Sequence, residues 1–339
     1  MPSVEELLSH KELIDYTKTR TPQKKVLEEL FPSRKTEALE IKMIRGANNL
    51  PVSASIHAFD TETEIDQRES ASYDVAELAL IKRKRKLSEK EIIRLEQPRN
   101  DAEEKEAVQK IYNDVDDLND SVLTRVEVMR VEALSTGELS INENGYKAKI
   151  DYGVPAAHKQ TFAWSGGTPE ILHDMDGAVD KIVEDTGFTP TRALTSKKNL
   201  NIILKDEKIR KAVFGVNSDR LLSRQELNNF LQTQGLPQIA IYDAKYRTLT
   251  AKGTYAAKRY FTESAFVFMP DGDMGETLFG LTAEELELRK KEGVDISEIG
   301  NVIIEQYATN DPVAKWIKAV ATALVTFPCA DQVYIATIK

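Results

Sequence analysis

Apolar side chains recur every three or four residues along one long stretch in the first half of the chain. The stripe consists of Val108, Ile111, Tyr112, Val115, Leu118, Val122, Val126, Met129 and Ala133. Asn100 is suited to cap a helix that has Glu103 three residues later, and Gly137 is suited to end it. The pattern predicts a helix of about 35 residues over 100–135, about 50 Å long, with one face against a core.

Alternation of apolar and polar residues flanks this helix on both sides. Residues 36–87 alternate at their beginning and end but are polar and acidic in the middle, which predicts a long extended loop with two strand-like legs. After the helix, Asn144-Gly145 joins two alternating segments within 137–153 and predicts a β-hairpin. Residues 1–40 show only short helical patterns without a broad apolar face, so we expect an arm that buries little by itself.

The rest of the chain mixes helical and strand patterns. Helices are predicted to begin at Thr168-Pro169, at the capping box of Ser223 and Glu226, and at Thr282. The segments predicted as strands are 191–196, 238–247, 264–270 and parts of 311–339. These patterns indicate a mixed α and β region that follows the long helix in the sequence.

Composition and charge narrow the class of protein. The 339 residues carry 46 Lys and Arg against 55 Asp and Glu, a net charge of −9, which argues against a dedicated duplex-binding protein. The single cysteine, Cys329, excludes an internal disulfide, and we expect a buried, inert thiol. The first residues lack the apolar core of a signal peptide, and the longest apolar run, 319–327, is too short to span a bilayer. We therefore expect a protein made in a reducing cytoplasm, with no membrane partner.

No catalytic, cofactor-binding or metal-binding set emerges from the sequence. The segment WSGGTPE, 164–170, has two glycines before a helix but lacks the lysine of a Walker motif and the glycine spacing of a dinucleotide-binding turn. The four histidines are scattered, without metal-ligand spacing. We predict no cofactor, and we interpret Gly166 and Gly167 as a hinge between two rigid parts.

Five consecutive cations are the most marked charge feature: Lys82, Arg83, Lys84, Arg85 and Lys86. In an extended segment they alternate between two sides, so two or three of them can line one surface. Such a run can contact an acidic neighbouring protein, contact nucleic acid or remain a solvated edge. We favour the acidic neighbour and predict that these five residues contact other subunits.

Three longer stretches carry a resemblance to a known family. They are RVEVMRVEALSTGELSINENGYKAKIDYG (125–153), FAWSGGTPEILHDM (162–175) and NDPVAKWIKAVATALVTFPCADQVYIATIK (310–339). In this order and spacing they resemble the major capsid proteins of tailed bacteriophages, specifically the lambda-like coat protein family. The similarity in layout extends over essentially the whole chain.

The resemblance implies an α+β fold of the Hong Kong 97 type and five parts. These are an N-terminal arm (1–42), an extended loop or E-loop (43–90), a P-domain with the spine helix (91–161), an A-domain (162–310) and C-terminal return strands (311–339). It implies a virion protein that assembles in the host bacterial cytoplasm as pentamers and hexamers around packaged double-stranded DNA. The expected partners are other copies of the chain, a portal and a separate scaffolding protein. The scaffolding protein is expected to be separate because the arm of about forty residues is too short to contain a fused one. The resemblance is also compatible with a decoration protein.

Two other hypotheses remain open from the sequence. An encapsulin-like compartment would use the same fold to hold protein cargo. A two-lobed cytosolic enzyme would need a catalytic set, which the sequence does not provide.

Overall fold

The computed structural model describes residues 25–45, 72–166, 169–215, 219–250, 253–290, 301–311 and 313–339. The chain divides into two units, each formed by separate segments. Unit 1 contains Met1–Ile41, Ala76–Arg130 and Glu276–Val325, and unit 2 contains Lys42–Val75, Val131–Gly275 and Thr326–Lys339. Residues 276–310, which we expected in the A-domain, therefore group with 76–130. The finer division into five parts stays a prediction.

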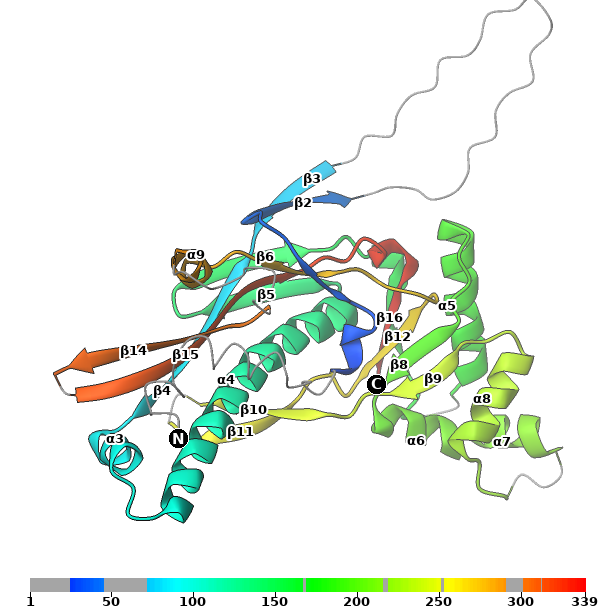
Figure 1. Ribbon diagram of the computed structural model, residues 1–339. Coiled ribbons are helices and arrows are strands. Elements are labelled where there is room, and N and C mark those ends of the chain that lie inside the picture. Colours follow the sequence, from blue (N-terminus) through cyan, green and yellow to red (C-terminus); the bar gives the residue numbers. More distant parts are fainter. Residues whose placement is uncertain are drawn as a thin grey trace, which may run out of the picture. The chain divides into compact units, whose positions relative to one another are not determined.

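The predicted long helix is confirmed as α4 (Asp101–Thr136) (Figure 1). The Asn100 Oδ1 accepts a hydrogen bond from the Glu103 backbone N at 2.9 Å, which caps the helix as the sequence predicts. Along the part of α4 in unit 1, the apolar stripe is buried at Ile111, Val115, Leu118, Val122 and Val126. This stripe packs against one face of a sheet, which explains its spacing of three and four residues.

The sheet of unit 1 has five strands in which β15 (Val313–Val325) is the longest. Its path runs β1 (Ser33–Lys35), β13 (Thr277–Gly280), β15 and β14 (Ile303–Asn310), and β4 (Ala79–Leu87) pairs antiparallel with the other side of β15. Two helices accompany it, α3 (Glu89–Glu96) and α9 (Ala283–Arg289). Because side chains alternate along each strand, one face of this sheet meets α4 and the other carries a separate set of residues.

Residues 26–35 belong to the core of unit 1. The side chains of Leu27, in the short helix η1 (Val26–Glu28), and of Phe31 are fully buried, and β1 pairs parallel with β13. The Leu27 backbone N also donates to the Glu127 Oε1 of α4 at 3.1 Å. The expectation that the arm buries little is therefore wrong for this part, because two large apolar side chains and a strand anchor it. Residues 1–24 lie outside the described part of the chain.

The two strand-like legs of the extended loop are confirmed. They form β2 (Glu40–Arg45) and β3 (Ser72–Glu77), which pair with each other in a two-stranded sheet (Figure 1). Residues 46–71, between the legs, lie outside the described part of the chain, so the course of the loop itself stays a prediction.

Unit 2 contains the predicted hairpin of β5 (Glu138–Glu143) and β6 (Tyr146–Asp151). Its turn places Asn144 at φ 49° and Gly145 at φ 86°, as a two-residue turn with left-handed backbone requires. A second five-stranded sheet follows, in the order β7 (Lys159–Phe162), β16 (Tyr334–Ile338), β12 (Ala265–Met269), β8 (Arg192–Thr195) and β9 (Gln238–Ile241).

Four helices cover one face of this second sheet: α5 (Ile171–Thr186), α6 (Lys197–Lys205), α7 (Glu207–Phe214) and α8 (Arg224–Thr233). The predicted capping box of Ser223 and Glu226 is present at the start of α8. A further hairpin, β10 (Lys245–Leu249) with β11 (Tyr255–Arg259), forms a two-stranded sheet of its own. The prediction of one strand over 238–247 is therefore wrong, because this stretch is divided between β9 and β10, which belong to different sheets.

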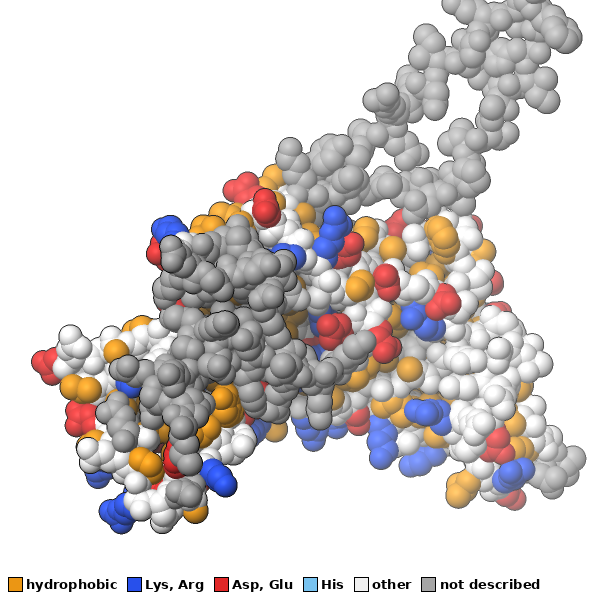
Figure 2. Space-filling model, in the orientation of Figure 1, with side chains coloured by type: hydrophobic (Ala, Val, Ile, Leu, Met, Phe, Trp, Pro, Cys, Tyr) orange, Lys and Arg blue, Asp and Glu red, His pale blue; other side chains and the backbone are white. Residues whose placement is uncertain are grey.

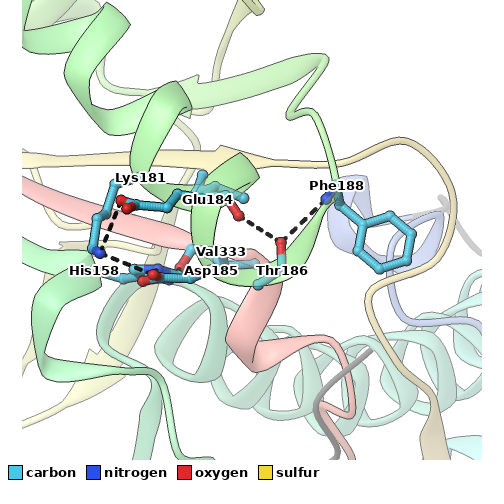
Figure 3. Close-up of polar contacts among 8 residues, drawn as sticks. His158, Lys181, Glu184, Asp185, Thr186, Phe188 and Val333 are labelled. Atoms are coloured by element: carbon cyan, nitrogen blue, oxygen red, sulfur yellow. Dashed lines mark hydrogen bonds and ion pairs between the residues drawn. The ribbon is translucent and has the colours of Figure 1, made fainter. Parts of the chain in front are cut away.

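A buried histidine joins three elements of unit 2. The His158 side chain, at the end of η2 (Ala156–His158), is fully buried, and its Nδ1 lies 3.2 Å from the Val333 O while its Nε2 lies 3.0 Å from the Asp185 Oδ2 (Figure 3). Lys181 donates to the same carboxylate at 2.8 Å. Hydrogen bonds from Lys181 and then from His158 hold the pKa of Asp185 below its usual range. These contacts fix the last turn of α5 to the neighbouring backbone.

Candidate assembly interface

The five predicted contact cations all lie on β4, where they alternate between the two faces of the unit 1 sheet. The register pairs Lys82 with Val320, Lys84 with Lys318 and Lys86 with Trp316, so these residues share the face that points away from α4. Arg83 and Arg85 lie on the opposite face, with the core residues of β15. The prediction that an extended strand divides the run between two sides is confirmed.

On the face toward α4, Arg85 is bound to carboxylates of its own chain. Its Nη1 donates to Asp114 of α4 and lies 3.1 Å from the Asp117 Oδ2. Burial by itself lowers the pKa of the guanidinium, but the hydrogen bonds to both aspartates outweigh this effect and raise it. Arg85 therefore fastens β4 to the long helix, and it is not available as a free cation for a neighbour.

On the outward face, two lysines converge on one carboxylate. Lys82 and Lys318 donate to the Glu284 Oε1 of α9 at 3.1 and 2.9 Å, and Lys318 also reaches the Glu305 Oε2 of β14 at 2.7 Å. Burial by itself raises the pKa of Glu284, but hydrogen bonds from Lys318, from its own backbone and from Lys82 lower it overall. Glu284 and Glu305 thus offset the repulsion expected between Lys318 and its directly opposed neighbour Lys84.

Lys84 packs against two aromatic rings. Its Nζ lies 4.4 Å from the centre of the Trp316 ring and donates to the Tyr307 hydroxyl at 3.2 Å. The two rings are stacked, with centroids 6.2 Å apart. The Nζ of Lys86 lies farther from Trp316, at 6.0 Å. Both lysines are exposed, and in the described part of the chain neither forms an ion pair. On the outward face they are the two members of the run whose charge is not met by a carboxylate of the described residues.

The residues that define this face were not predicted from the sequence. Glu284, Lys318, Trp316 and Tyr307 come from three separate segments, and their contacts depend on the pairing of β4, β15 and β14. The local pattern that could have pointed to them is the spacing of two residues between Glu305 and Tyr307 and between Trp316 and Lys318, which places each pair on one face of a strand.

The predicted hinge is described only in part. Gly166 is exposed, and no atom lies within 4 Å of the position that a Cβ would take, so neither space nor a left-handed backbone requires glycine there. On one side, Trp164 is buried and its Nε1 donates to the Asp174 Oδ2 at 2.9 Å; on the other, Ile171 is buried in the same core. Both sides of the loop are thus anchored within unit 2. Gly167 lies outside the described residues, and the hinge stays a prediction.

The other chemistry considered from the sequence gives no site. Within the described ranges, no three His, Cys, Asp or Glu side chains lie together as a metal site would require. Cys329 is half-buried, and burial raises the pKa of its thiol, which disfavours the reactive thiolate. Among the helices that the structure describes, none is long and apolar enough to cross a membrane.

Known proteins are similar to this chain over most of its length. Residues 9–338 match the family of phage major capsid protein E. A protein assigned as a prophage capsid protein of E. coli CFT073 is similar with a TM-score of 0.57 and 15% identity, over 79% of this chain and 80% of that chain. A phage-related protein from Bordetella bronchiseptica RB50 gives a TM-score of 0.53 and 12% identity, over 96% of this chain and 95% of that chain. Comparison with curated proteins gives no match.

These findings decide between the hypotheses that the sequence left open. At such low identities the two structures show the fold alone, which is the Hong Kong 97 type with mixed α and β elements. The matched family is a structural one and not a family of enzymes, and it does not favour an encapsulin-like compartment. Since the match covers both units, the chain belongs to the phage major capsid protein E family and is a structural subunit of a viral capsid shell.

Proposed function

We propose that copies of this chain assemble as pentamers and hexamers into an icosahedral head shell that encloses packaged double-stranded DNA. The observation that carries this proposal is the family match from residue 9 to residue 338, which leaves almost no part of the chain for another activity. Assembly takes place in the cytoplasm of the host bacterium. Its partners are a separate scaffolding protein and a portal, and the shell is compatible with a decoration protein. Repeated weak contacts suffice, because closure of a symmetric shell multiplies them.

Electron microscopy tests the assembly proposal directly. The full chain is expressed alone and together with a scaffolding protein encoded near it, and the purified particles are imaged. We expect closed shells, or rings and tubes with one common capsomer spacing. A strictly monomeric or dimeric particle under both conditions would contradict the proposal.

Within this proposal, Lys84 and Lys86 are the cations of β4 that pair with carboxylates of neighbouring subunits. Support comes from their exposure and from the contrast with Lys82 and Arg85, whose charges are already met by Glu284, Asp114 and Asp117 of the same chain. Arg83 lies on the opposite face, toward α4, so the prediction for five residues is narrowed to the two outward-facing lysines without an ion pair. An acidic neighbour is preferred because the chain as a whole carries a net charge of −9.

Charge reversal at these two lysines tests the contact. Lys84→Glu combined with Lys86→Glu is expected to reduce the yield of shells at least tenfold, measured by sedimentation, while circular dichroism stays unchanged. Lys90→Glu is the matched control, because Lys90 is an exposed lysine of the adjacent helix α3 without an ion pair in the described part of the chain. Equal yields from the reversed variant and the control would remove these residues from the interface.

The hinge role of Gly166 and Gly167 belongs to the same proposal. Valine at both positions restricts the backbone, so Gly166→Val with Gly167→Val is expected to slow shell expansion without unfolding unit 2. Time-resolved small-angle scattering of the shells measures the expansion. An unchanged expansion rate would show that these glycines are not a hinge.

A further inference from the structure

Unit 2 carries a basic hollow at the start of α6. The hollow has a volume of about 400 Å³, and its lining includes the four cations Lys197, Lys198, Lys205 and Arg259 and one carboxylate, Asp243. Figure 2 shows Lys and Arg side chains gathered over the region where Figure 1 places α6. Four positive charges against one negative charge leave the hollow with an excess of positive charge.

Intrachain contacts do not remove this excess. Arg259 is bound to Asp243 and lies 3.3 Å from the Glu263 Oε1, and Lys198 reaches the Glu263 Oε2 at 3.5 Å. Lys197 and Lys205 have no carboxylate partner among the described residues. In addition, Lys197 and Lys198 occupy the first turn of α6, where the helix dipole disfavours positive charge. Local helix stability therefore does not explain their presence.

The hairpin of β10 and β11 extends this basic surface. Its register places Lys245, Arg247 and Leu249 on the same face as Tyr255 and Arg259. No residue of either strand is buried, and Leu249 and Tyr255 remain 60% and 58% exposed. A two-stranded hairpin without a fully buried residue gains little from its own packing, so cover by another surface would stabilise it. We call the hollow together with this hairpin face the basic surface.

The same unit carries an opposite surface on α5. Asp176, Asp180 and Glu184 follow one another at intervals of four residues, directly opposite the buried side of the helix, and all three are exposed. Beside them, Val183 and Phe188 are 38% and 43% exposed. We call these five residues the acidic stripe.

The charges of the acidic stripe destabilise α5, as those of Lys197 and Lys198 destabilise α6. Carboxylates spaced by four residues on a helix repel one another. Glu184 also lies in the last turn of α5, where the helix dipole disfavours negative charge, and this turn contains no basic residue. Lys181 lies 3.4 Å from Glu184, but Asp176 and Asp180 have no cation partner in the described part of the chain. Lys197 and Lys198 on α6 and Glu184 on α5 thus carry charge at the unfavourable end of their helix.

We propose that the basic surface of one copy binds the acidic stripe of the next copy, head to tail. This inference rests on the proposed function, in which the chain assembles with itself. Each surface supplies what the other lacks: cations face carboxylates, and Leu249 and Tyr255 face Val183 and Phe188. Because the two surfaces differ, the contact is heterologous, and repeated rotation by the same angle closes it into a ring.

Charge reversal on each side tests the pairing. The first variant combines Lys197→Glu and Lys205→Glu, the second combines Asp176→Lys and Asp180→Lys, and the third carries all four changes. All four residues are exposed and none has an ion pair in the described part of the chain, so we expect all three variants to fold as well as the wild type by circular dichroism. Lys147→Glu and Asp219→Lys, at exposed positions elsewhere in unit 2 without described ion pairs, are the controls.

We expect the first two variants to lose rings and shells at least tenfold in sedimentation velocity and electron microscopy, with scaffolding protein present. The variant with all four changes should assemble again, because its two surfaces are complementary once more. An equimolar mixture of the first two should form hexamers but not pentamers, since an alternating ring needs an even number of copies.

The remaining outcomes separate the two proposals. Absence of rings from the wild type itself would overturn the proposed function. Assembly of the wild type and of the reversed variants alike, or failure of the fourfold variant to recover, would overturn the head-to-tail contact and leave the proposed function standing. Normal shells that retain less double-stranded DNA after Lys197→Glu and Lys205→Glu would assign the basic surface to nucleic acid and overturn the contact.

Discussion

The two five-stranded sheets are stabilised in different ways. In unit 2 the central strand β12 is buried at all five residues, and four helices cover one face of the sheet. In unit 1 the long helix α4 covers one face, whereas the other face carries the lysines, glutamates and aromatic rings around Glu284 and Trp316. Apolar burial therefore dominates in unit 2, while unit 1 combines it with charge contacts that leave two lysines open to a neighbour.

The stability of each unit can be measured separately, because each unit contains one of the two tryptophans. Trp164 lies in the core of unit 2, and Trp316 lies on the charged face of unit 1. The variant Trp316→Phe leaves a fluorescence probe for unit 2, and Trp164→Phe leaves one for unit 1.

The largest effect is expected in the core of unit 2. Phe268→Ala removes a fully buried ring that lies 4.9 Å from the Phe266 ring and 6.0 Å from the Tyr334 ring, between centroids. We expect a loss of about 4 kcal/mol in the free energy of unfolding, measured by urea titration with Trp164 as the probe. Leu221→Ala, at a residue that is 88% exposed, is the control and should change little. Similar losses in both variants would argue against a well-packed core.

The next effect concerns the buried ion pair of unit 1. Glu127 and Arg130 lie 3.4 Å apart on α4, and Arg130 also donates to the Thr277 Oγ1 at 2.8 Å. Glu127→Ala leaves a buried positive charge and is expected to cost about 3 kcal/mol, with Trp316 as the probe. Combining it with Arg130→Met should recover part of the loss, because no buried charge then remains. A double variant that is less stable than Glu127→Ala would contradict this explanation.

A smaller loss is expected on the charged face. Glu284→Gln removes the carboxylate shared by Lys82 and Lys318 and should cost about 1–2 kcal/mol in unit 1, with Trp316 as the probe. Glu287→Gln changes an exposed carboxylate on the same helix, α9, and is expected to have almost no effect. Equal losses would mean that the position of Glu284 between the two lysines does not matter.

The same carboxylate makes unit 1 sensitive to acid. Hydrogen bonds hold the pKa of Glu284 in the folded chain below the ordinary value of 4.5. Its contribution to stability is therefore complete above about pH 4.5 and is lost as the pH falls through the lowered pKa. We expect the difference in unfolding free energy between wild type and Glu284→Gln to shrink on acidification from about pH 7 to pH 3. A difference that grows toward low pH would contradict the assigned direction.

The smallest effect is expected at Lys84. Lys84→Met removes the cation above Trp316 and should lower the stability of unit 1 by about 0.5–1 kcal/mol, while Lys84→Arg should retain most of it. Titration with denaturant, followed by Trp316 fluorescence, measures the change, and Lys90→Met serves as the exposed control. A loss of several kcal/mol would mean that Lys84 is a structural residue rather than one available to a neighbouring subunit.

Local patterns predicted much of the fold correctly. The stripe from Ile111 to Val126 predicted α4, Asn144-Gly145 predicted the turn between β5 and β6, and Ser223 with Glu226 predicted the start of α8. Each of these features depends on residues that are close in the sequence, so no knowledge of the tertiary structure is needed.

The arm shows where such patterns fail. Leu27 and Phe31 are too few to form an apolar periodicity, yet both are fully buried because unit 1 supplies their partners from distant segments. Periodicity detects a face of an element, and it does not detect single anchoring residues.

The sequence by itself determined the long helix, the hairpin of β5 and β6 and, through three stretches, the resemblance to the capsid family to which the chain belongs. It also determined that five cations on one strand alternate between two faces. Only the tertiary structure decided which of them keep a free charge, because Lys82 meets Glu284 at a separation of 202 residues and Arg85 meets an aspartate of α4. Alternation of side chains along a strand is a local property, so it can be predicted from the sequence. The position of a partner carboxylate depends on how distant segments pack, so it is decided only by the tertiary structure.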